Sequence, residues 1–488
     1  MAAGITHTPV AVDARAAFVV HSPPMRKAKI LATVGPASRD PAVLDALLAA
    51  GVDGFRVNFS HGLADEHRET VKRIREASQR AGRVVAVLGD LSGPKIRCGT
   101  FANGPVELRE GQTFSFTSRE VPGDETIVSA TYPLARDLTP GDTVLLDDGM
   151  LRMRVTSVEG EDVHCVVEVG GALSDRKGIN LPGARLKTPA LTEKDRRDAA
   201  LAREIGVDFV ALSFVRRADD VFQARSLVGP GLPIVAKIEK PEAVEDLDAI
   251  LDASDGAMVA RGDLGVELGP EKVPLVQKRV IECTNGRSKL VITATQMLDS
   301  MIRAPRPTRA EAADVANAVL DATDVLMLSG ETASGRYPVE SVAMMDSIIR
   351  EVERSELFRR VTELPSTNRD WDYTHACAAA ASLTSRNALL RAIVVFTRQG
   401  HTANMVAEFR PRSPIVAVTA SLSAAQRLAL QWGTVPVHGE YPTNVAEAVT
   451  LAAEAARQYV GAKARDTIGV VSGSQRDTGT KCFVLHTL

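Results

Sequence analysis

Eight short apolar runs, each followed by a stretch with helical spacing, constrain the fold of this chain more than any other feature. The runs are rich in Val, Ile and Leu, as expected of strands that are buried on both faces. Most lie about 25–35 residues apart, the length of a strand–helix unit with its loops. The pattern predicts an α/β fold with an eight-stranded parallel barrel, a (β/α)8 TIM barrel. The expected strands are KILATVG (29–35), GFRVNFS (54–60), VVAVLGD (84–90), DFVALSF (208–214), IVAKIE (234–239), GAMVARGD (256–263), LVITATQ (290–296) and DVLMLSG (324–330).

Residues 94–186 interrupt this regular spacing, because they separate the third and fourth runs by far more than one strand–helix unit. Apolar and polar residues alternate there between turn signals such as PGDE, TPGD and VEGED, which is typical of a small all-β module. An insertion after the third strand stands at the catalytic end of such a barrel. We expect a β-barrel lid that closes over a substrate and excludes water. An insertion without such a role is the alternative.

A third region, residues 357–488, has strand-like runs at 391–397, 414–420, 434–439 and 466–473 with helical segments between them. It predicts an open α/β sheet domain, separate from the barrel. The barrel is then expected to occupy residues 26–93 and 187–356. Residues 1–25 lack the basic start and long apolar core of a secretion signal, so we interpret them as an N-terminal extension.

Charge and cysteine content exclude several classes of function. Lys and Arg number 58 against 61 Asp and Glu, which leaves no basic surplus for binding a nucleic acid. No apolar stretch approaches the roughly 20 residues that a membrane helix needs. The cysteines are odd in number and stand apart, so a disulfide framework or a zinc site is not expected. Reduced thiols and a cytoplasmic protein are the simplest interpretation.

Charged residues gather where two of the predicted strands end. Lys237 and Glu239 stand two positions apart on the fifth strand, so they share a face, and the next run ends at Asp263. A buried Lys is costly unless it meets an anion. One cation beside two carboxylates indicates a hard metal ion next to an anionic substrate, whereas Lys237 with Glu239 alone would be a structural ion pair. The backbone N–H groups of Gly262 and Asp263 could also dock a carboxylate.

The second and third strands end in further polar residues. Arg56 suits a phosphoryl group, and Asn58 and Ser60 share one face of the strand. Asp90 ends the third strand, before the hinge-like Gly-Pro of GDLSGPKIR (89–97). The alternatives are a surface salt bridge for Arg56 and a helix cap for Asp90.

The remaining candidate functional residues follow the last two barrel strands and lie in one loop of the third region. Thr295 and Ser329 place hydroxyls after the seventh and eighth strands, although Thr295 could instead cap a helix. In TRQGHTANMV (397–406) a strand, a polar turn and a helix start follow one another. A helix N-terminus with free N–H groups suits a phosphate, although an ordinary strand–helix turn has the same sequence pattern.

Nine motifs occur in one order from about residue 26 to the C-terminus: ATVGPAS, RVNFSH, GPKIR, KGINLPG, ALSFV, AKIE, MVARGDLGVE, TATQML and MLSGETASGRYP. Together they resemble the pyruvate kinase family. The resemblance implies transfer of the phosphoryl group of phosphoenolpyruvate to ADP, which gives pyruvate and ATP.

The resemblance also implies roles at the strand ends. Glu239 and Asp263 would bind Mg²⁺ or Mn²⁺. Lys237 would neutralise the transferring phosphoryl group, and Arg56 would bind it. The residues expected to face the nucleotide are Asn58, His61, Arg97 and Lys177.

The resemblance also implies which residues bind the substrate carboxylate and which deliver a proton to the enolate; they follow the last strands of the barrel. Gly262, Asp263 and Thr295 would hold the carboxylate. After transfer, the enolate of pyruvate takes a proton at its methylene carbon, and Thr295 and Ser329 match the positions of a water-linked proton path.

Many family members also bind K⁺, with residues that match Asn58, Ser60, Asp90 and the carbonyl of Leu91. Members that require K⁺ carry Glu where this chain has Lys95, and Thr-Lys where it has Leu91-Ser92. This chain is therefore similar to the K⁺-independent group. The ammonium of Lys95 can stand where the monovalent ion would sit, so K⁺ is not expected to be required.

In the family the loop at 397–402 belongs to a site for a phosphorylated allosteric effector, with VSGSQRDTG (471–479) as a candidate second wall. The sequence leaves open fructose 1,6-bisphosphate, AMP and a sugar monophosphate. A homotetramer is implied. The candidate effector residues are Thr397, Arg398, Gln399, Gly400, His401 and Thr402.

Two rival functions remain at this point. A non-catalytic relative that binds phosphometabolites would be expected to lose the carboxylates, the Lys or the Arg, and none is lost here. A different barrel enzyme acting on phosphoenolpyruvate or pyruvate, such as a mutase or lyase, would lack the β lid and the third domain.

Overall fold

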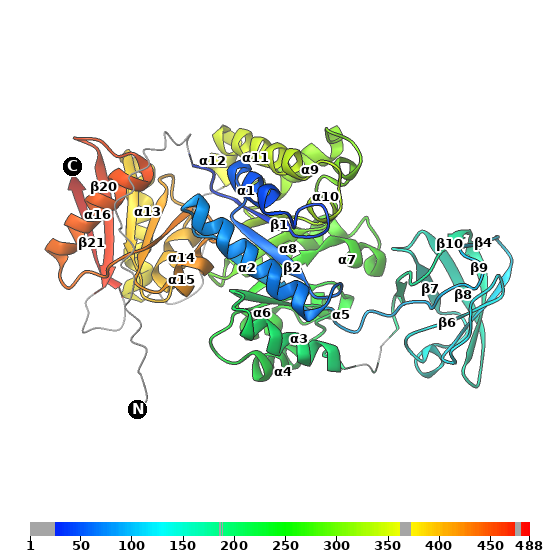
Figure 1. Ribbon diagram of the computed structural model, residues 1–488. Coiled ribbons are helices and arrows are strands. Elements are labelled where there is room, and N and C mark those ends of the chain that lie inside the picture. Colours follow the sequence, from blue (N-terminus) through cyan, green and yellow to red (C-terminus); the bar gives the residue numbers. More distant parts are fainter. Residues whose placement is uncertain (1–24, 185–186, 188, 362–371, 474–479) are drawn as a thin grey trace, which may run out of the picture.

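The computed structural model describes residues 25–184, 187, 189–361, 372–473 and 480–488. Figure 1 shows the barrel in the middle, the lid on one side of it and the C-terminal domain on the opposite side. The lid is inserted after the third barrel strand, and the chain then returns to complete the barrel. Residues 1–24 of the expected N-terminal extension (1–25) and the loop segment 474–479 lie outside the described residues.

In the described part of the chain, eight parallel strands close into a barrel, which confirms the predicted fold class. Their order around the barrel is β1-β16-β15-β14-β13-β12-β3-β2. Nearly every strand residue is buried, because the side chains point either into the barrel or against the surrounding helices. The strands are β1 Lys29–Thr33, β2 Gly54–Asn58, β3 Ala86–Asp90, β12 Phe209–Leu212, β13 Ile234–Ile238, β14 Gly256–Ala260, β15 Leu290–Ala294 and β16 Val325–Leu328.

The helices that surround the barrel begin and end at recognisable capping residues. Thr192 and Thr308 each accept a hydrogen bond from a backbone N–H of the first turn and form capping boxes. Gly51 and Gly82 end two helices with positive φ angles of 114° and 59°. The helices are α1 Pro41–Ala50, α2 Ala64–Ala81, α3 Glu193–Glu204, α4 Ala218–Val228, α5 Pro241–Glu245, α6 Leu247–Ala253, α7 Arg261–Leu268, α8 Val273–Asn285, α9 Arg309–Leu320, α10 Gly330–Ala333, α11 Pro338–Arg354 and α12 Glu356–Val361, with the 3-10 turn η2 Asp299–Ile302.

The lid is built from strands, as predicted, and the 3-10 turn η1 Leu134–Arg136 is the exception among its described elements. Six strands form one sheet and two form another, around a core of their own. Alternate residues of β9 are buried, as expected of a sheet with one face toward a core. The strands are β4 Val106–Leu108, β5 Thr113–Thr117, β6 Ile127–Ser129, β7 Thr143–Leu146, β8 Leu151–Glu159, β9 Asp162–Val169, β10 Gly171–Leu173 and β11 Ile179–Asn180.

The C-terminal domain has an open sheet of order β19-β18-β17-β20-β21 over its described residues. The first four strands are parallel, as predicted, and β21 is an antiparallel edge strand that the sequence pattern did not reveal. The strands are β17 Leu390–Phe396, β18 Ile415–Thr419, β19 Thr434–His438, β20 Thr467–Gly473 and β21 Thr480–Thr487. The helices are α13 Tyr373–Asn387, α14 His401–Glu408, α15 Leu422–Leu428 and α16 Val445–Val460.

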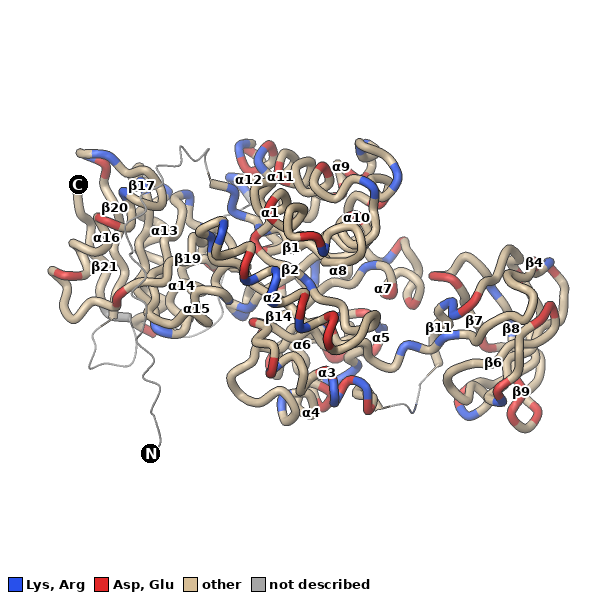
Figure 2. Tube along the Cα trace, viewed as in Figure 1, with Lys and Arg blue, Asp and Glu red and all other residues tan. Residues whose placement is uncertain are grey.

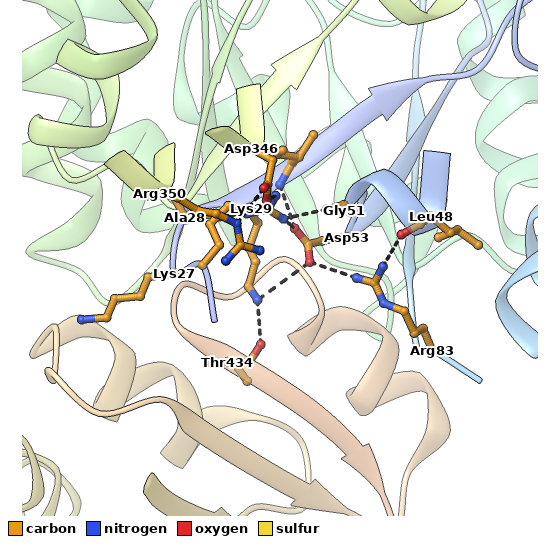
Figure 3. Close-up of polar contacts among 12 residues, drawn as sticks. Lys27, Ala28, Lys29, Leu48, Gly51, Asp53, Arg83, Asp346, Arg350 and Thr434 are labelled. Carbon is orange, nitrogen blue, oxygen red and sulfur yellow. Dashed lines mark hydrogen bonds and ion pairs between the residues drawn. The ribbon is translucent and has the colours of Figure 1, made fainter. Parts of the chain in front are cut away.

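A buried ionic cluster lies where the base of the barrel meets the C-terminal domain (Figure 3). Asp53, which precedes β2, forms an ion pair with Arg26 and lies 4.0 Å from Lys29 Nζ and 3.6 Å from Arg83 Nη2. Lys29 Nζ donates to the carbonyl of Thr434, in β19, at 2.7 Å. Burial alone would raise the pKa of Asp53, but the three cations outweigh it and hold the pKa below its usual range. One ammonium therefore ties the barrel to the C-terminal sheet.

A second buried ion pair joins the same two domains. Arg410, just after α14, lies 2.7 Å from the carboxylate of Asp324, which precedes β16, and the two side chains are 6% and 2% exposed. The guanidinium also donates to Asn285 Oδ1 and to the carbonyl of Ala322, both at 2.9 Å. Its face lies over the ring of Trp432, 4.8 Å from the centroid. The C-terminal end of α14 is thus fixed to the barrel.

Charges of both signs are interleaved along the barrel helices (Figure 2), in keeping with the formal net charge of −3. No helix in the described ranges is both long enough and apolar enough to span a membrane. The cysteines at 98, 165, 283, 377 and 482 all carry free thiols.

Candidate active site

Lys237 is the centre of a charged cluster at the carboxyl ends of neighbouring barrel strands. Its ammonium, near the end of β13, donates to Ser213 Oγ at 2.7 Å. It lies 3.3 Å from Asp90 Oδ1, at the end of β3, and 3.0 Å from Glu239 Oε1, just after β13. Arg56, in β2, donates to Asp90 Oδ2 at 2.7 Å. The structure therefore brings together the Lys, the Arg and two of the carboxylates that the sequence singled out.

Burial and charge act against each other in this cluster. Burial alone would raise the pKa of Asp90, but Lys237 and Arg56 outweigh it and hold that pKa below its usual range. Burial would lower the pKa of Lys237, and Asp90 and Glu239 reverse this, so its pKa is raised. Burial, reinforced by Asp263, raises the pKa of Glu239 despite the nearby Lys237. The Lys and Asp90 are held charged, and Glu239 would be stabilised as a carboxylate by an added cation.

Asp263 lies in the first turn of α7, directly after β14. Its Oδ1 accepts a hydrogen bond at 3.3 Å from Nζ of Lys95, which comes from the hinge leading into the lid. Among the described residues, no group of three or more His, Cys, Asp or Glu side chains could hold a metal ion. The pair Glu239 and Asp263 nevertheless suits Mg²⁺, which binds through one or two carboxylates and takes its other oxygen ligands from substrate and water.

The loop after β15 packs against the start of α7. A Cβ on Gly262 would lie 2.7 Å from Thr295 Cγ2, so a glycine is needed for this close approach. The N–H groups of Gly262 and Asp263 belong to the first turn of α7, where backbone donors have no partner within the helix. A helix N-terminus next to a hydroxyl can bind a carboxylate. Thr295 is not a helix cap, because it begins an irregular turn with φ +74°.

Ser329 follows β16 and is tied to the loop that carries Thr295. The backbone N–H of Ser329 donates to Glu331 Oε2 at 2.7 Å, and the N–H of Leu298 donates to Glu331 Oε1 at 3.0 Å. Glu331 is buried. One carboxylate therefore fixes the two loops that carry the predicted hydroxyls.

The residues predicted for a monovalent ion lie around the ends of β2 and β3. The N–H of Ser60 donates to Asn58 Oδ1 at 3.1 Å. The carbonyl of Leu91 accepts from Ser213 Oγ at 2.7 Å, and the same hydroxyl lies 3.4 Å from Asp90 Oδ1. Lys95, predicted to replace the ion, instead contacts Asp263 in this arrangement.

The predicted nucleotide residues come from the barrel and from the lid. Burial, together with Arg97 and other nearby cations, lowers the pKa of His61, so this side chain lies in a positive field that suits a polyphosphate. Arg97 Nη1 donates to the carbonyl of Arg176 at 3.1 Å, which places it beside Lys177 in the lid. Lys177 Nζ lies 2.7 Å from Asp147 Oδ1.

The lid base is also tied to the helix that carries Asp263. Glu267, one turn further along α7, is buried and lies 2.5 Å from Lys240 Nζ. The same carboxylate oxygen accepts from Nδ2 of Asn180, in β11 of the lid, at 3.1 Å. The lid is therefore hydrogen-bonded directly to α7.

The predicted effector loop connects β17 to α14 in the C-terminal domain. Gly400, with φ +100°, is the N-cap of α14, and its N–H donates to Thr397 Oγ1 at 3.0 Å. The guanidinium of Arg398 lies over the ring of Tyr441, 5.4 Å from its centroid. The loop thus has the form of a helix N-terminus with an Arg beside it. Most of the expected second wall, residues 474–479, lies outside the described residues.

Three side chains of the site have no role in the sequence prediction. Ser213 bridges Lys237 and the carbonyl of Leu91. Thr33 Oγ1 accepts from Arg56 Nη1 at 3.3 Å. Arg261 contacts the loop of Thr295. Thr33 ends β1 and Ser213 directly follows β12, so the positional signal that identified Thr295 could also have identified them.

A parallel barrel with fixed cations and carboxylates at its carboxyl end, and with a β domain inserted after its third strand, is the arrangement expected of a phosphoryl-transfer enzyme of the kinase class. Family models for the barrel domain and the alpha/beta domain of pyruvate kinase match residues 25–342 and 375–483. This chain belongs to the pyruvate kinase family, and the function predicted from the motifs is confirmed at that level.

Similar curated proteins cover most of the chain. The pyruvate kinase of Sporosarcina psychrophila is 45% identical over 90% of this chain and 76% of its own length. That of Mycobacterium tuberculosis (strain ATCC 25618 / H37Rv) is 48% identical over 84% of this chain and 87% of its own. A pyruvate kinase of Agrobacterium vitis is 44% identical over 92% of this chain and 93% of its own length.

Proposed function

We propose that the chain transfers the phosphoryl group of phosphoenolpyruvate to ADP at the carboxyl end of its barrel. The observation that carries this proposal is the position of Lys237, whose ammonium is held among Asp90, Glu239 and Ser213, with Arg56 on the other side of Asp90. Phosphoryl transfer depends on positioning and charge stabilisation rather than on covalent chemistry by the protein. Two cations that are held by buried partners meet that requirement, because they need little reorganisation during the reaction.

Arg56 and Lys237 are proposed to bind the oxygens of the transferring phosphoryl group. Glu239 and Asp263 are proposed to hold Mg²⁺ or Mn²⁺, because both supply hard oxygen ligands and because a cation would offset the burial and the Asp263 charge that raise the pKa of Glu239. When bound, such an ion neutralises charge on phosphoryl oxygens as a Lewis acid.

We assign binding of the substrate carboxylate and delivery of the proton to the side of the site formed by α7 and the loop after β15. The N–H groups of Gly262 and Asp263 and the hydroxyl of Thr295 are proposed to bind the substrate carboxylate. Once the phosphoryl group has left, the enolate of pyruvate forms a C–H bond at its methylene carbon, and its oxygen becomes a carbonyl. Thr295 and Ser329 are proposed to line the water path that delivers this proton.

The nucleotide is proposed to lie between barrel and lid, against Asn58, His61, Arg97 and Lys177. The positive field at His61 supports a polyphosphate there. Closure of the lid would bring Arg97 and Lys177 toward the barrel and exclude water.

Turnover without K⁺ is proposed because Lys95 brings an ammonium to the carboxylate cluster through Asp263. The rate in buffer with Na⁺ only should remain above about a tenth of the rate with K⁺. A Lys95→Glu variant should acquire a K⁺ requirement, and a variant that is equally active in both buffers would contradict the assignment.

Regulation, assembly and location complete the proposal. A phosphorylated effector is assigned to Thr397, Arg398, Gln399, Gly400, His401 and Thr402, because an anion suits the α14 N-terminus and the adjacent Arg398. The chain is proposed to form a homotetramer in the cytoplasm.

The test is pyruvate formation from phosphoenolpyruvate and ADP with Mg²⁺, for the unaltered chain and for Lys237→Met. The matched control is Lys278→Met, because Lys278 pairs with Asp321 and is 56% exposed. We expect the Lys237 variant alone to lose about 10²-fold or more in kcat. Pyruvate formed without ADP would indicate a different enzyme, and no turnover with any divalent ion or effector would favour a phosphometabolite-binding protein.

A further inference from the structure

Two successive non-glycine residues adopt positive φ angles in the loop after β15. Thr295 has φ +74° and Gln296 has φ +54°. Residues with a Cβ rarely occupy this region, and β-branched residues such as Thr do so least. Such a conformation persists only where the surroundings enforce it, and it often occurs at functional sites. Thr295 is also a proposed contact of the substrate, so its enforced conformation bears on the reaction.

The guanidinium of Arg261 contacts the backbone of this turn. It donates to the carbonyl of Thr295 at 2.8 Å, and its donors lie 3.3 Å from the carbonyl of Ala294 and 3.4 Å from that of Gln296. The same Nη2 that donates to Thr295 also lies 2.8 Å from the sulfur of Met297. A single planar fork therefore contacts four consecutive residues of the turn, a geometry that an ammonium cannot reproduce.

Arg261 is itself anchored on its other side. Its Nη1 lies 2.7 Å from Asp314 Oδ1, in α9, and 3.4 Å from Gln277 Oε1, in α8. The side chain is 10% exposed. Its own backbone begins α7, immediately before Gly262, where an added Cβ would lie 2.7 Å from Thr295 Cγ2. Arg261 thus connects the two segments that are proposed to hold the substrate carboxylate.

We propose that Arg261 is a positioning residue that fixes the Thr295 hydroxyl for protonation of the enolate. The inference rests on the proposed function and goes beyond it by separating two steps. Phosphoryl transfer is assigned to Arg56 and Lys237, on the β2 and β13 side of the site. Proton delivery is assigned to the turn that Arg261 holds. Loss of Arg261 should therefore slow the protonation step more than the transfer step.

The two steps can be measured separately in the full-length chain. Single-turnover formation of ATP reports transfer. Exchange of the methyl protons of pyruvate for deuterium, followed by NMR with ATP and Mg²⁺ present, reports protonation, because this step must run backward along the same path. The variants are Arg261→Met, Arg261→Lys and Asp314→Asn. The last keeps the guanidinium of Arg261 but weakens its ion pair with residue 314.

A matched control is available on the same barrel. Arg287 is 16% exposed and forms ion pairs at 2.7 and 2.8 Å with Asp248 and Asp252. Arg287→Met removes a comparably paired guanidinium that lies outside the proposed catalytic machinery. It should alter neither step, whereas a general loss of barrel stability would affect both.

For Arg261→Met we expect methyl exchange to fall at least about tenfold further than ATP formation. The solvent deuterium effect on kcat should rise, since protonation becomes the slower step. Arg261→Lys should recover little, and Asp314→Asn should show a smaller change in the same direction. Equal losses in both steps, or no loss in exchange, would overturn this inference alone. Absence of ATP formation by the unaltered chain would overturn the proposed function and this inference with it.

Discussion

Replacement of Arg410 by Met should test how strongly the C-terminal domain is fixed to the barrel. The change leaves the carboxylate of Asp324, which is 2% exposed, with the N–H of Val291 at 2.9 Å as its remaining hydrogen bond among those described. Removing one partner of a buried ion pair costs about 3–5 kcal/mol, because the other charge stays buried without compensation. We expect a loss of that size in the free energy of unfolding. Asp324→Asn should cost less, about 1–3 kcal/mol, because Arg410 keeps its bonds to Asn285 and Ala322.

The assay is urea unfolding of the two single variants and of the double variant, followed by circular dichroism. The double variant no longer holds an unpaired buried charge, so its cost should fall short of the sum by about 1–3 kcal/mol. Arg350→Met is a suitable control, because Arg350 forms its ion pair with Asp346 within the single helix α11. Single costs that add to within about 0.5 kcal/mol would refute the reasoning.

The same variants should differ in their response to pH. Burial raises the pKa of Asp324, even though Arg410 opposes the effect. A carboxyl whose folded-state pKa exceeds its unfolded value contributes stability below the unfolded pKa, and this stability is lost as pH rises through the folded pKa. Without Arg410 the folded pKa rises further. Destabilisation of Arg410→Met should therefore grow as pH increases from about 4, and Asp324→Asn should abolish that growth.

Three further predictions concern the active site. Glu239→Gln should raise the Mg²⁺ concentration needed for half-maximal activity by about 10–100-fold, and an unchanged Mg²⁺ dependence would contradict its role as a ligand. Gly262→Ala should lower kcat/KM for phosphoenolpyruvate by about tenfold or more, because the new Cβ would lie 2.7 Å from Thr295 Cγ2; kinetics equal to those of Gly265→Ala, where a Cβ would have 3.5 Å to its nearest neighbour, would be evidence against this packing. Removal of divalent ions by a chelator should abolish turnover, and added Mg²⁺ or Mn²⁺ should restore it; activity that survives chelation would exclude a metal role.

Much of the fold follows from the sequence because barrel strands leave a strong signal. Both faces of β13 and β14 are buried, so their residues read as continuous apolar runs that end in charged residues. Parallel strands bring their carboxyl ends to one edge, which is why Lys237, Glu239 and Asp263 could be expected near one another without a structure. The edge strand β21 was missed, since it mixes polar and apolar residues and has a neighbour on one side alone.

The rest of the site depends on information that local sequence does not carry. Lys95 and Asp263 are 168 positions apart, and their contact depends on how the lid hinge leaves the barrel. The positive φ of Thr295 is contrary to the preference of a β-branched residue, so sequence rules predict the opposite. The carbonyl of Thr295 is bound by Arg261, whose partner Asp314 lies on a later helix. Such dependence on distant groups is typical of functional sites.

The buried position of Trp432 has a practical consequence for the study of this chain. The sequence contains two tryptophans, and Trp432 is 1% exposed, in the same apolar cluster as the barrel core. Lys27 of the barrel side and Arg410 place their cations 5.2 and 4.8 Å from its ring. In a Trp371→Phe variant, which lacks the second tryptophan, the fluorescence of Trp432 would report on its surroundings alone. Its emission would shift to the red if the C-terminal domain separated from the barrel, so domain movement could be followed in real time without an attached dye.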